Sequence, residues 1–308
     1  MLNRIKILSL TILALAALLL AACGGDGGDA AGNDTTSNVD EGKVNDDLFV
    51  SAGAEVLSNS AERFAAEIES MQGEMDFAIT TDGETVDAHA DFAFQSPDGM
   101  HMLMTMNIPQ DSGVDLGELD FEIIARDGTM YMTMPLFGGW MSMDLDDLGV
   151  DAEGLQDMLE SGSPFDYQQL VDAFGEVKFV GEETLDGRVV VHYSVSADMA
   201  NVLDSFAESL EGSGAELGEA GDISGPMTLD IWVGKDDYLP YQMTMDAAVD
   251  TADGAFAMEL TISVSGYNDP VDIPDAPADA LPFDEFFEDL GESFEDGLDL
   301  RVGTPEPD

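Results

Sequence analysis

Apolar and polar residues alternate with a period of two along much of the chain, and this alternation predicts a large antiparallel sheet. We expect strands at residues 74–81, 84–95, 100–108, 120–126, 129–134, 139–145, 176–184, 187–196, 226–234, 238–248 and 255–266. Apolar spacing near 3.6 predicts helices at 46–71, 151–174 and 197–212. The fold class is therefore α+β, a large antiparallel sheet with a few helices that cover one face.

Asp-Gly pairs between the strands predict tight turns and set the strand register. A three-residue loop around Asp98-Gly99 pairs Phe94 with Met102, Phe92 with Met104 and Ala90 with Met106. A two-residue turn at Asp127-Gly128 pairs Ala125 with Met130, Ile123 with Met132 and Phe121 with Met134. Both registers separate apolar from polar residues, whereas a slip by one residue would mix the two faces.

The two hairpins contain seven of these alternating methionines, Met100 among them, and the alternation at 139–145 and 238–248 brings the number to eleven on the period-two faces of one sheet. This methionine-rich face has three possible interpretations: a core rich in methionine, a deformable hydrophobic cavity, or a thioether copper site. As candidate cavity-lining residues we name Phe92, Phe94, Met102, Met104, Met106, Phe121, Ile123, Met130, Met132, Met134, Met141, Met143, Met243 and Met245. The copper interpretation suffers because His101 points to the opposite face from its methionine neighbours.

The N-terminus predicts export and lipid attachment. Arg4 and Lys6 precede an apolar run over 7–20, which is typical of a signal peptide occupying residues 1–22. The run ends in Leu-Ala-Ala-Cys, which resembles a bacterial lipobox with Cys23 as the lipidated residue. A transmembrane anchor over 5–22 is the alternative. Residues 23–45 then form a flexible linker rich in Gly, Asp and Asn, followed by a domain at 46–278.

Composition argues against nucleic acid as a partner. The chain has 65 acidic and 9 basic residues and a formal net charge of −56, so we expect no nucleic-acid partner. Such a surface suits either a saline host or an acidic secreted protein. A single cysteine leaves none for disulfides once it is lipidated.

We expect no catalytic site, no metal site and no cofactor. His89, His101 and His192 lie on separate strands without a nucleophile motif, and there is no HExxH, P-loop or GxGxxG helix start. The acidic loop 144–153 could bind Ca²⁺ weakly, although Leu155 stands where an EF-hand would place its bidentate Glu.

Three segments resemble the LppX/LprG group of lipoproteins and, more loosely, the LolA lipoprotein carrier. They are FVGEETLDG at 179–187 with VHYSV at 191–195, IWVGKDDYLP at 231–240, and YNDPVDIP at 267–274. The resemblance implies a half-barrel, that is, a curved antiparallel sheet wrapped around helices with a hydrophobic cavity between them. It also implies a lipid-anchored protein on the outer face of the cell membrane that binds an acylated lipid or lipoprotein for transfer or retention.

Two features depart from that group. An acidic surface would repel an anionic head group at the cavity mouth, and residues 279–308 extend beyond the closing strand as an acidic tail. Phe283, Phe286, Phe287, Leu290 and Phe294 fall on one helical face of this tail, which is either a docking helix or a disordered segment. An interaction or sensor module with the same fold, a filled core and an envelope protein as its partner remains the alternative function.

Overall fold

A computed structural model describes residues 46–81, 83–96, 99–109, 117–133, 135, 138–144, 177–200, 224–251 and 254–283. The signal peptide, Cys23, the linker, the helix expected at 151–174, Met134 and most of the C-terminal tail lie outside these residues. So does all but the first residue of the acidic loop 144–153. Neither described helix is long and apolar enough to cross a membrane.

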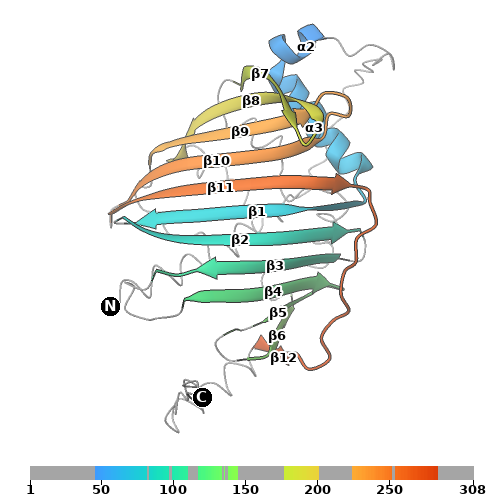
Figure 1. Cartoon of the computed structure of the whole chain (residues 1–308), viewed down its shortest axis with the longest axis vertical. Coiled ribbons are helices and arrows are strands. Elements are labelled where there is room, and N and C mark those ends of the chain that lie inside the picture. The colour runs from blue at the N-terminus through green and yellow to red at the C-terminus, as the bar shows by residue number, and fades with distance from the viewer. Residues whose placement is uncertain are drawn as a thin grey trace, which may run out of the picture.

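One sheet of twelve strands forms the body of the described chain (Figure 1). Its strands are β1 (Ser70–Thr81), β2 (Glu84–Gln95), β3 (Gly99–Asn107), β4 (Glu118–Arg126), β5 (Thr129–Thr133), β6 (Trp140–Asp144), β7 (Val177–Leu185), β8 (Arg188–Asp198), β9 (Pro226–Gly234), β10 (Pro240–Thr251), β11 (Gly254–Tyr267) and β12 (Leu281–Pro282). The first eleven confirm the strands expected from the alternation. The short β12 is new.

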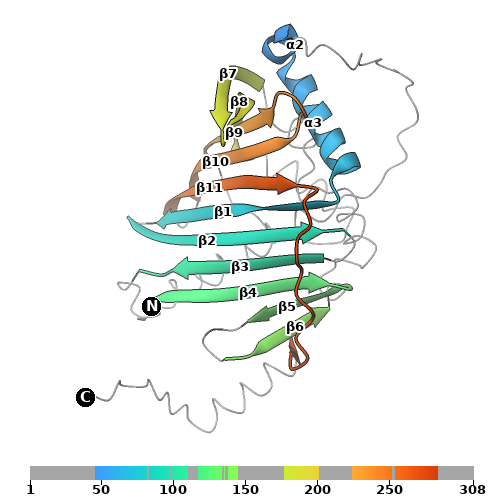
Figure 2. The same cartoon turned by 45° about the vertical axis from the view of Figure 1, so that its right-hand side comes forward.

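The strand order is β12-β6-β5-β4-β3-β2-β1-β11-β10-β9-β8-β7. Most neighbours in space are therefore neighbours in sequence, as in a meander. Two pairings join strands that are not consecutive in sequence: β12 with β6 at one edge, and β1 with β11 at the centre in antiparallel register. All pairings are antiparallel except that of β12 with β6. The sheet curves but does not close, since β7 and β12 are its two edges, so it is a half-barrel (Figure 2).

Two helices replace the single helix expected at 46–71: α2 (Asp46–Ser51) and α3 (Gly53–Glu67). Ala52 interrupts them with φ −134° and ψ 48°. A side chain at Gly53 would lie 2.9 Å from Cγ1 of Val177 and 3.1 Å from the Tyr193 ring, so this glycine lets the start of α3 approach the sheet closely.

The helix ends four residues earlier than expected because its last turn is replaced by tertiary hydrogen bonds. The backbone N–H of Glu69 donates to Oδ1 of Asn268 at 2.7 Å, and Asn268 N–H donates to the Ser70 carbonyl at 2.8 Å. Residues 68–71 are therefore extended and lead into β1 beside β11. Likewise, residues 197 and 198, expected to begin a helix, complete β8.

The register expected for the β2–β3 hairpin was wrong by two residues. Met102 pairs with Phe92, Met104 with Ala90 and Met106 with Ala88, and Gln95 pairs with Gly99. Gly99 is not in the loop but in the strand, with φ +128°. A Cβ there would collide with the Ala125 carbonyl oxygen of β4, so close contact with β4 decides where the loop ends. Because the slip is even, every side chain keeps its expected face.

The β4–β5 register was right. Arg126 pairs with Thr129, Ala125 with Met130 and Ile123 with Met132. Asp127 and Gly128 have φ values of 54° and 76°, as a type I′ turn requires. The remaining expected pair, Phe121 with Met134, stays a prediction, because Met134 lies outside the described residues.

Candidate functional site

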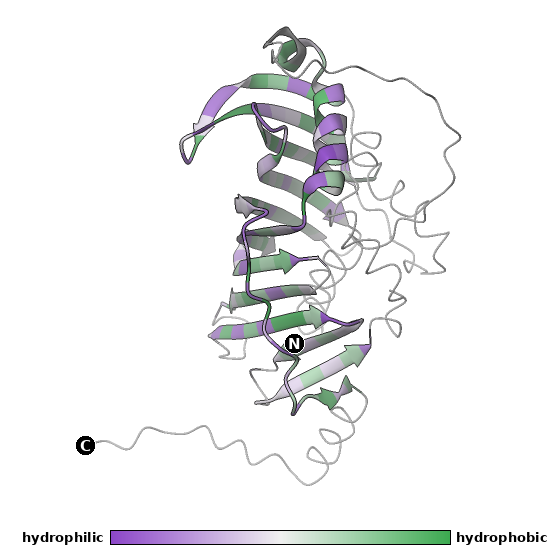
Figure 3. Cartoon of the chain, turned by 90° about the vertical axis from the view of Figure 1, so that its right-hand side faces the viewer, coloured by the Kyte–Doolittle hydropathy of each residue, from purple (hydrophilic) through white to green (hydrophobic). Residues whose placement is uncertain are grey.

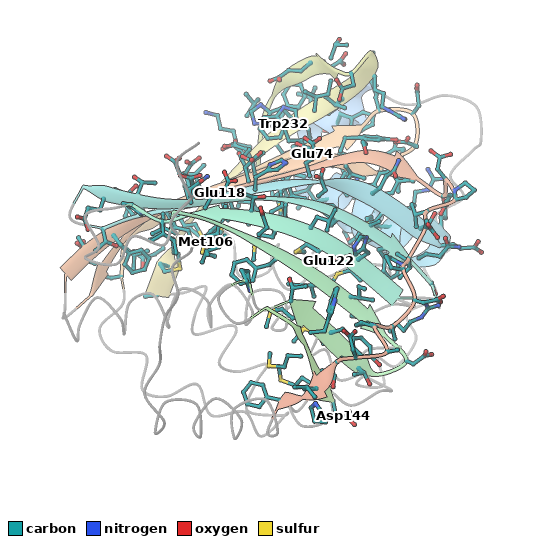
Figure 4. The ribbon with its side chains drawn as sticks, turned by 60° about the horizontal axis from the view of Figure 1, so that its bottom comes forward. Glu74, Met106, Glu118, Glu122, Asp144 and Trp232 are labelled. Atoms are coloured by element: carbon teal, nitrogen blue, oxygen red, sulfur yellow. The ribbon has the colours of Figure 1, made fainter. Side chains whose placement is uncertain are left out.

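The candidate site is the concave face of the sheet, and cross-strand pairing makes it continuous. Met104 pairs with Ala90 on one side and Phe121 on the other. Through Ala90, Met75 and Ile262 the same face extends to Met243 and Ile231. Figure 4 shows sulfur-bearing side chains, Met106 among them, on the inner side of the curve, whereas Glu74 and Trp232 lie on the outer side.

Of the three clusters of buried residues in the described chain, two line most of this face. The first lies under the helices: Phe49, Val56 and Leu57 pack with residues of β8, β9 and β10, and the Tyr193 hydroxyl donates to the Phe49 carbonyl at 2.9 Å. Figure 3 shows α3 standing beside this end of the sheet. Burial raises the pKa of the Tyr193 phenol, so it stays a neutral donor at physiological pH.

The second cluster occupies β1 to β4 and the adjoining part of β11, and it contains no residue of α2 or α3 within the described chain. Its buried members are Phe77, Ala88, Ala90, Met102, Met104, Met106, Ile108, Leu119, Ile123 and Leu260. Met102, Met104 and Met106 expose only 2%, 7% and 3% of their surface. These three candidates are thus part of a packed core.

Half-buried apolar side chains join and border the two clusters. Met245, Met258 and Ile262 contact both clusters, and we call these three residues the seam. Phe92, Phe121, Met130 and Met132 border the second cluster and are also half-buried. Partial exposure in the middle of an apolar face is what a ligand-binding surface needs, because these side chains still have surface to bury.

Every described candidate lies on the concave face. Phe94, Met141 and Met243 are buried, whereas Met143 and Met245 are half-buried. The sequence interpretation left out Met75, Phe77, Met258, Leu260 and Ile262, which β1 and β11 place between the two halves. Their alternation was visible, but only the pairing of β1 with β11 shows that they share the site.

The convex face is polar, and each histidine on it binds a carboxylate. His89 Nδ1 lies 2.8 Å from Asp76, and His101 Nε2 lies 2.9 Å from Glu122. The hydrogen bond to Asp76, with the negative charge of Asp76, Asp91 and Glu74, raises the pKa of His89 against the opposing effect of burial. The described residues bring together no group of three metal-binding side chains.

His192 is the most enclosed histidine of the three. Its Nδ1 lies 3.0 Å from Glu183 and its Nε2 lies 2.9 Å from Asp230, and its ring stacks on Trp232 at 4.2 Å. Hydrogen bonds from Trp232 and from His192 lower the pKa of the Glu183 carboxyl. This network links β7, β8 and β9 on the convex face. It therefore stabilises the pairing of these strands and does not contact the apolar concave surface.

A hollow of about 340 Å³ in the described chain opens on the convex face near Gln72, Asp91 and His101. It is shallow and bordered by carboxylates. The concave face therefore remains the candidate site on grounds of chemistry, since its half-buried methionines and phenylalanines offer a surface for an apolar ligand and no group for covalent chemistry.

A curved, open antiparallel sheet with helices over its apolar side defines the class of this protein as a half-barrel. The chain belongs to a family of unknown function, DUF6612, whose sequence profile matches residues 53–276. It is 29% identical over 160 residues to an uncharacterized 31.2 kDa protein of Streptomyces griseus from the rplA-rplJ intergenic region. That match covers 49% of this chain and 50% of the relative, so the chain spans half the length of the curated relative it matches.

Solved structures give similar arrangements. The chain is similar to LppX of Mycobacterium tuberculosis, with 13% identity, a TM-score of 0.42 and coverage of 72% of this chain and 98% of that one. It is similar to LprF of Mycobacterium bovis, with 16% identity, a TM-score of 0.41 and coverage of 72% and 95%. A LolA superfamily protein of Nitrosomonas europaea gives 9% identity, a TM-score of 0.25 and coverage of 73% and 94%.

Proposed function

We propose that this chain is a lipid-anchored lipoprotein of the cell envelope that binds a hydrophobic ligand on its concave face, for transfer or retention, without catalysis. The observation that carries the proposal is the seam with its half-buried neighbours in the middle of a continuous apolar face. Methionine is unbranched and polarisable, so such a surface adapts to flexible apolar guests. The ligand class is therefore an acylated lipid or lipoprotein, and the sequence motifs quoted above support the same class.

The energetics favour a chain-like ligand. Burial of apolar surface is worth ~0.8 kcal/mol per CH₂, so an acyl chain of ordinary length gains enough to offset the cost of immobilisation. The convex face carries most of the described carboxylates, whereas the concave face carries almost none. The acyl portion therefore fits the concave side, with any head group in solvent.

The first test asks whether an apolar ligand is present. The full chain with Cys23→Ser is purified, extracted with organic solvent and examined by mass spectrometry, and the stripped protein is titrated with a fluorescent acyl probe. We expect a co-purifying lipid and saturable probe uptake. Absence of both would exclude the carrier and leave an interaction module with a filled core, which the low exposure of the β3 methionines would explain.

The second test locates the ligand with matched variants. Met132→Lys places a charge on the half-buried part of the concave face and should abolish probe uptake with little loss of stability. Leu103→Lys is the control, because Leu103 lies on the convex face and is 47% exposed. Equal uptake by the two variants would exclude the concave face as the ligand site.

The third test addresses the anchor. Cys23→Ser should shift the protein from the membrane fraction to the soluble fraction, because the thiol is the point of lipid attachment in a lipobox. Retention of the variant in the membrane fraction would instead support an anchor that spans the membrane over 5–22.

A further inference from the structure

Residues 268–283 leave β11 and cross the ends of the strands down to the far edge of the sheet, and we call them the strap. Figures 1 and 2 show the strap descending along one side of the sheet past β1 to β5, and Figure 3 shows it from the front. It ends in β12, which pairs with β6. The strap therefore links the central strands to the strands of the edge.

The upper end of the strap is firmly held. The Asn268 side chain accepts from the N–H of Glu69 at 2.7 Å and donates to the Glu67 carbonyl at 2.8 Å. The buried Ser70 hydroxyl donates to the Asp269 carbonyl at 2.7 Å. Because backbone groups and a buried hydroxyl share these bonds, this end serves as a fixed anchor point.

One arginine holds the middle. Arg126 Nη1 donates to the Pro274 carbonyl at 3.0 Å and lies 3.2 Å from Oδ1 of Asp275. The Arg126 side chain is 22% exposed, whereas that of Asp275 is fully exposed. The sequence has no other Lys or Arg between residues 64 and 177.

The far end of the strap pairs with the sheet through short strands. β12 has two residues, and one of them, Pro282, has no N–H to donate. β5 and β6, which we call the arm, are only five residues long each, whereas β1 and β2 each have twelve. The arm therefore has fewer ladder hydrogen bonds than the central strands, and it carries half-buried Met130, Met132 and Met143 on its concave side.

We propose that the strap is a gate, in which Arg126 holds the arm in its bent position and release of the Pro274–Asp275 contact lets the arm swing away from the concave face. Hinge movement of a short, edge-held element is an established type of conformational change. The gating part of this proposal rests on the proposed function, whereas the restraint of the arm stands independently. An exposed ion pair is screened by salt, so ionic strength would favour release.

The restraint is tested by amide hydrogen exchange on the full chain with Cys23→Ser. In Arg126→Ala we expect amides of β6 and β12 to exchange about tenfold faster, since hydrogen bonds to a charged group are lost, while β9 and β10 keep their protection. Asp275→Asn keeps the Pro274 contact and should give an intermediate increase of about threefold. Lys178→Ala removes a charge of the same sign from exposed β7 and should change neither region.

The gate is tested by the kinetics of acyl-probe uptake. Arg126→Ala should take up and release probe about tenfold faster. Ser142 and Pro282 are register partners, so cysteines at both positions are within reach of a disulfide that locks β12 on β6. The oxidised double variant should take up probe more slowly than its reduced form.

The outcomes separate the two proposals. Unchanged exchange in Arg126→Ala, with β9 and β10 still protected, would overturn the restraint whatever the ligand. Faster exchange with normal uptake kinetics would overturn the gate. Faster exchange in a chain that binds no probe in any variant would confirm the restraint and overturn both the gate and the proposed function.

Discussion

Replacement of Met104 by lysine tests whether the β3 part of the concave face is a packed core. Met104 is 7% exposed and lies between Ala90 and Phe121 on neighbouring strands. Loss of its apolar burial costs about 2 kcal/mol. A lysine held there must lose its proton near pH 7, and a pKa lowered by about three units corresponds to roughly 4 kcal/mol.

The two effects predict a loss of about 6 kcal/mol in the free energy of unfolding, which is comparable to the whole stability of many domains, about 5–15 kcal/mol. Leu103→Lys changes the neighbouring residue on the exposed face and should cost no more than about 0.5 kcal/mol. Met104→Leu should cost less than about 1.5 kcal/mol, because volume is nearly conserved.

Urea denaturation followed by circular dichroism measures all three variants, with the midpoint compared at a common slope. The expected order of stability places Leu103→Lys near the parent chain, Met104→Leu slightly below it and Met104→Lys far below both. Equal costs for the two lysine variants would refute the assignment of faces to β3 and, with it, the whole description of the concave surface.

Three further predictions concern stability. Gly99→Ala should cost at least about 3 kcal/mol, because its Cβ would strike a β4 carbonyl at positive φ, whereas Gly83→Ala, with open space around it, should cost about 1 kcal/mol; a similar cost for both in urea melts would contradict the close contact. Tyr193→Phe should cost about 1–3 kcal/mol, since a helix carbonyl loses its buried donor, and thermal unfolding measures it. Because the folded-state pKa of Glu183 is lowered, its contribution to stability is complete above about pH 4.5 and is lost as the pH falls through the lower folded value. Stability curves of Glu183→Gln and the parent chain, followed by the fluorescence of the two tryptophans, should therefore differ at pH 7 and converge in acid.

Local signals in the sequence predicted the strands well because alternation depends only on which face of a strand is buried. The β4–β5 register was equally predictable, since Asp127-Gly128 admits one tight turn. The β2–β3 register was not, because the position of Gly99 depends on its contact with Ala125 of β4, which is distant in sequence. The end of α3 was mispredicted for a similar reason, since Asn268 takes the hydrogen bonds of the residues that follow Glu67.

The composition of the site was more predictable than its arrangement. The alternation placed the methionines on one face, and each candidate that the structure describes lies there. The seam could not be predicted, because it exists only where β10 and β11 meet the β1 half of the sheet. The contacts of Arg126 with Pro274 and Asp275 were also missed, although a single cation within a long acidic stretch of the sequence indicates an ionic contact.

The pairing of β1 with β11 has a consequence for how the protein matures. The anchor bonds beside this pair join residues 199 positions apart, Glu69 and Asn268. Nearly the whole chain must therefore be available before the middle of the sheet can form, and such long-range closure makes folding slow. Until then the methionine-rich strands expose apolar surface and unpaired strand edges, which promote aggregation. A chain of this design depends on protection while it folds, and its high negative charge supplies one form of protection, because like-charged chains repel one another before they can aggregate.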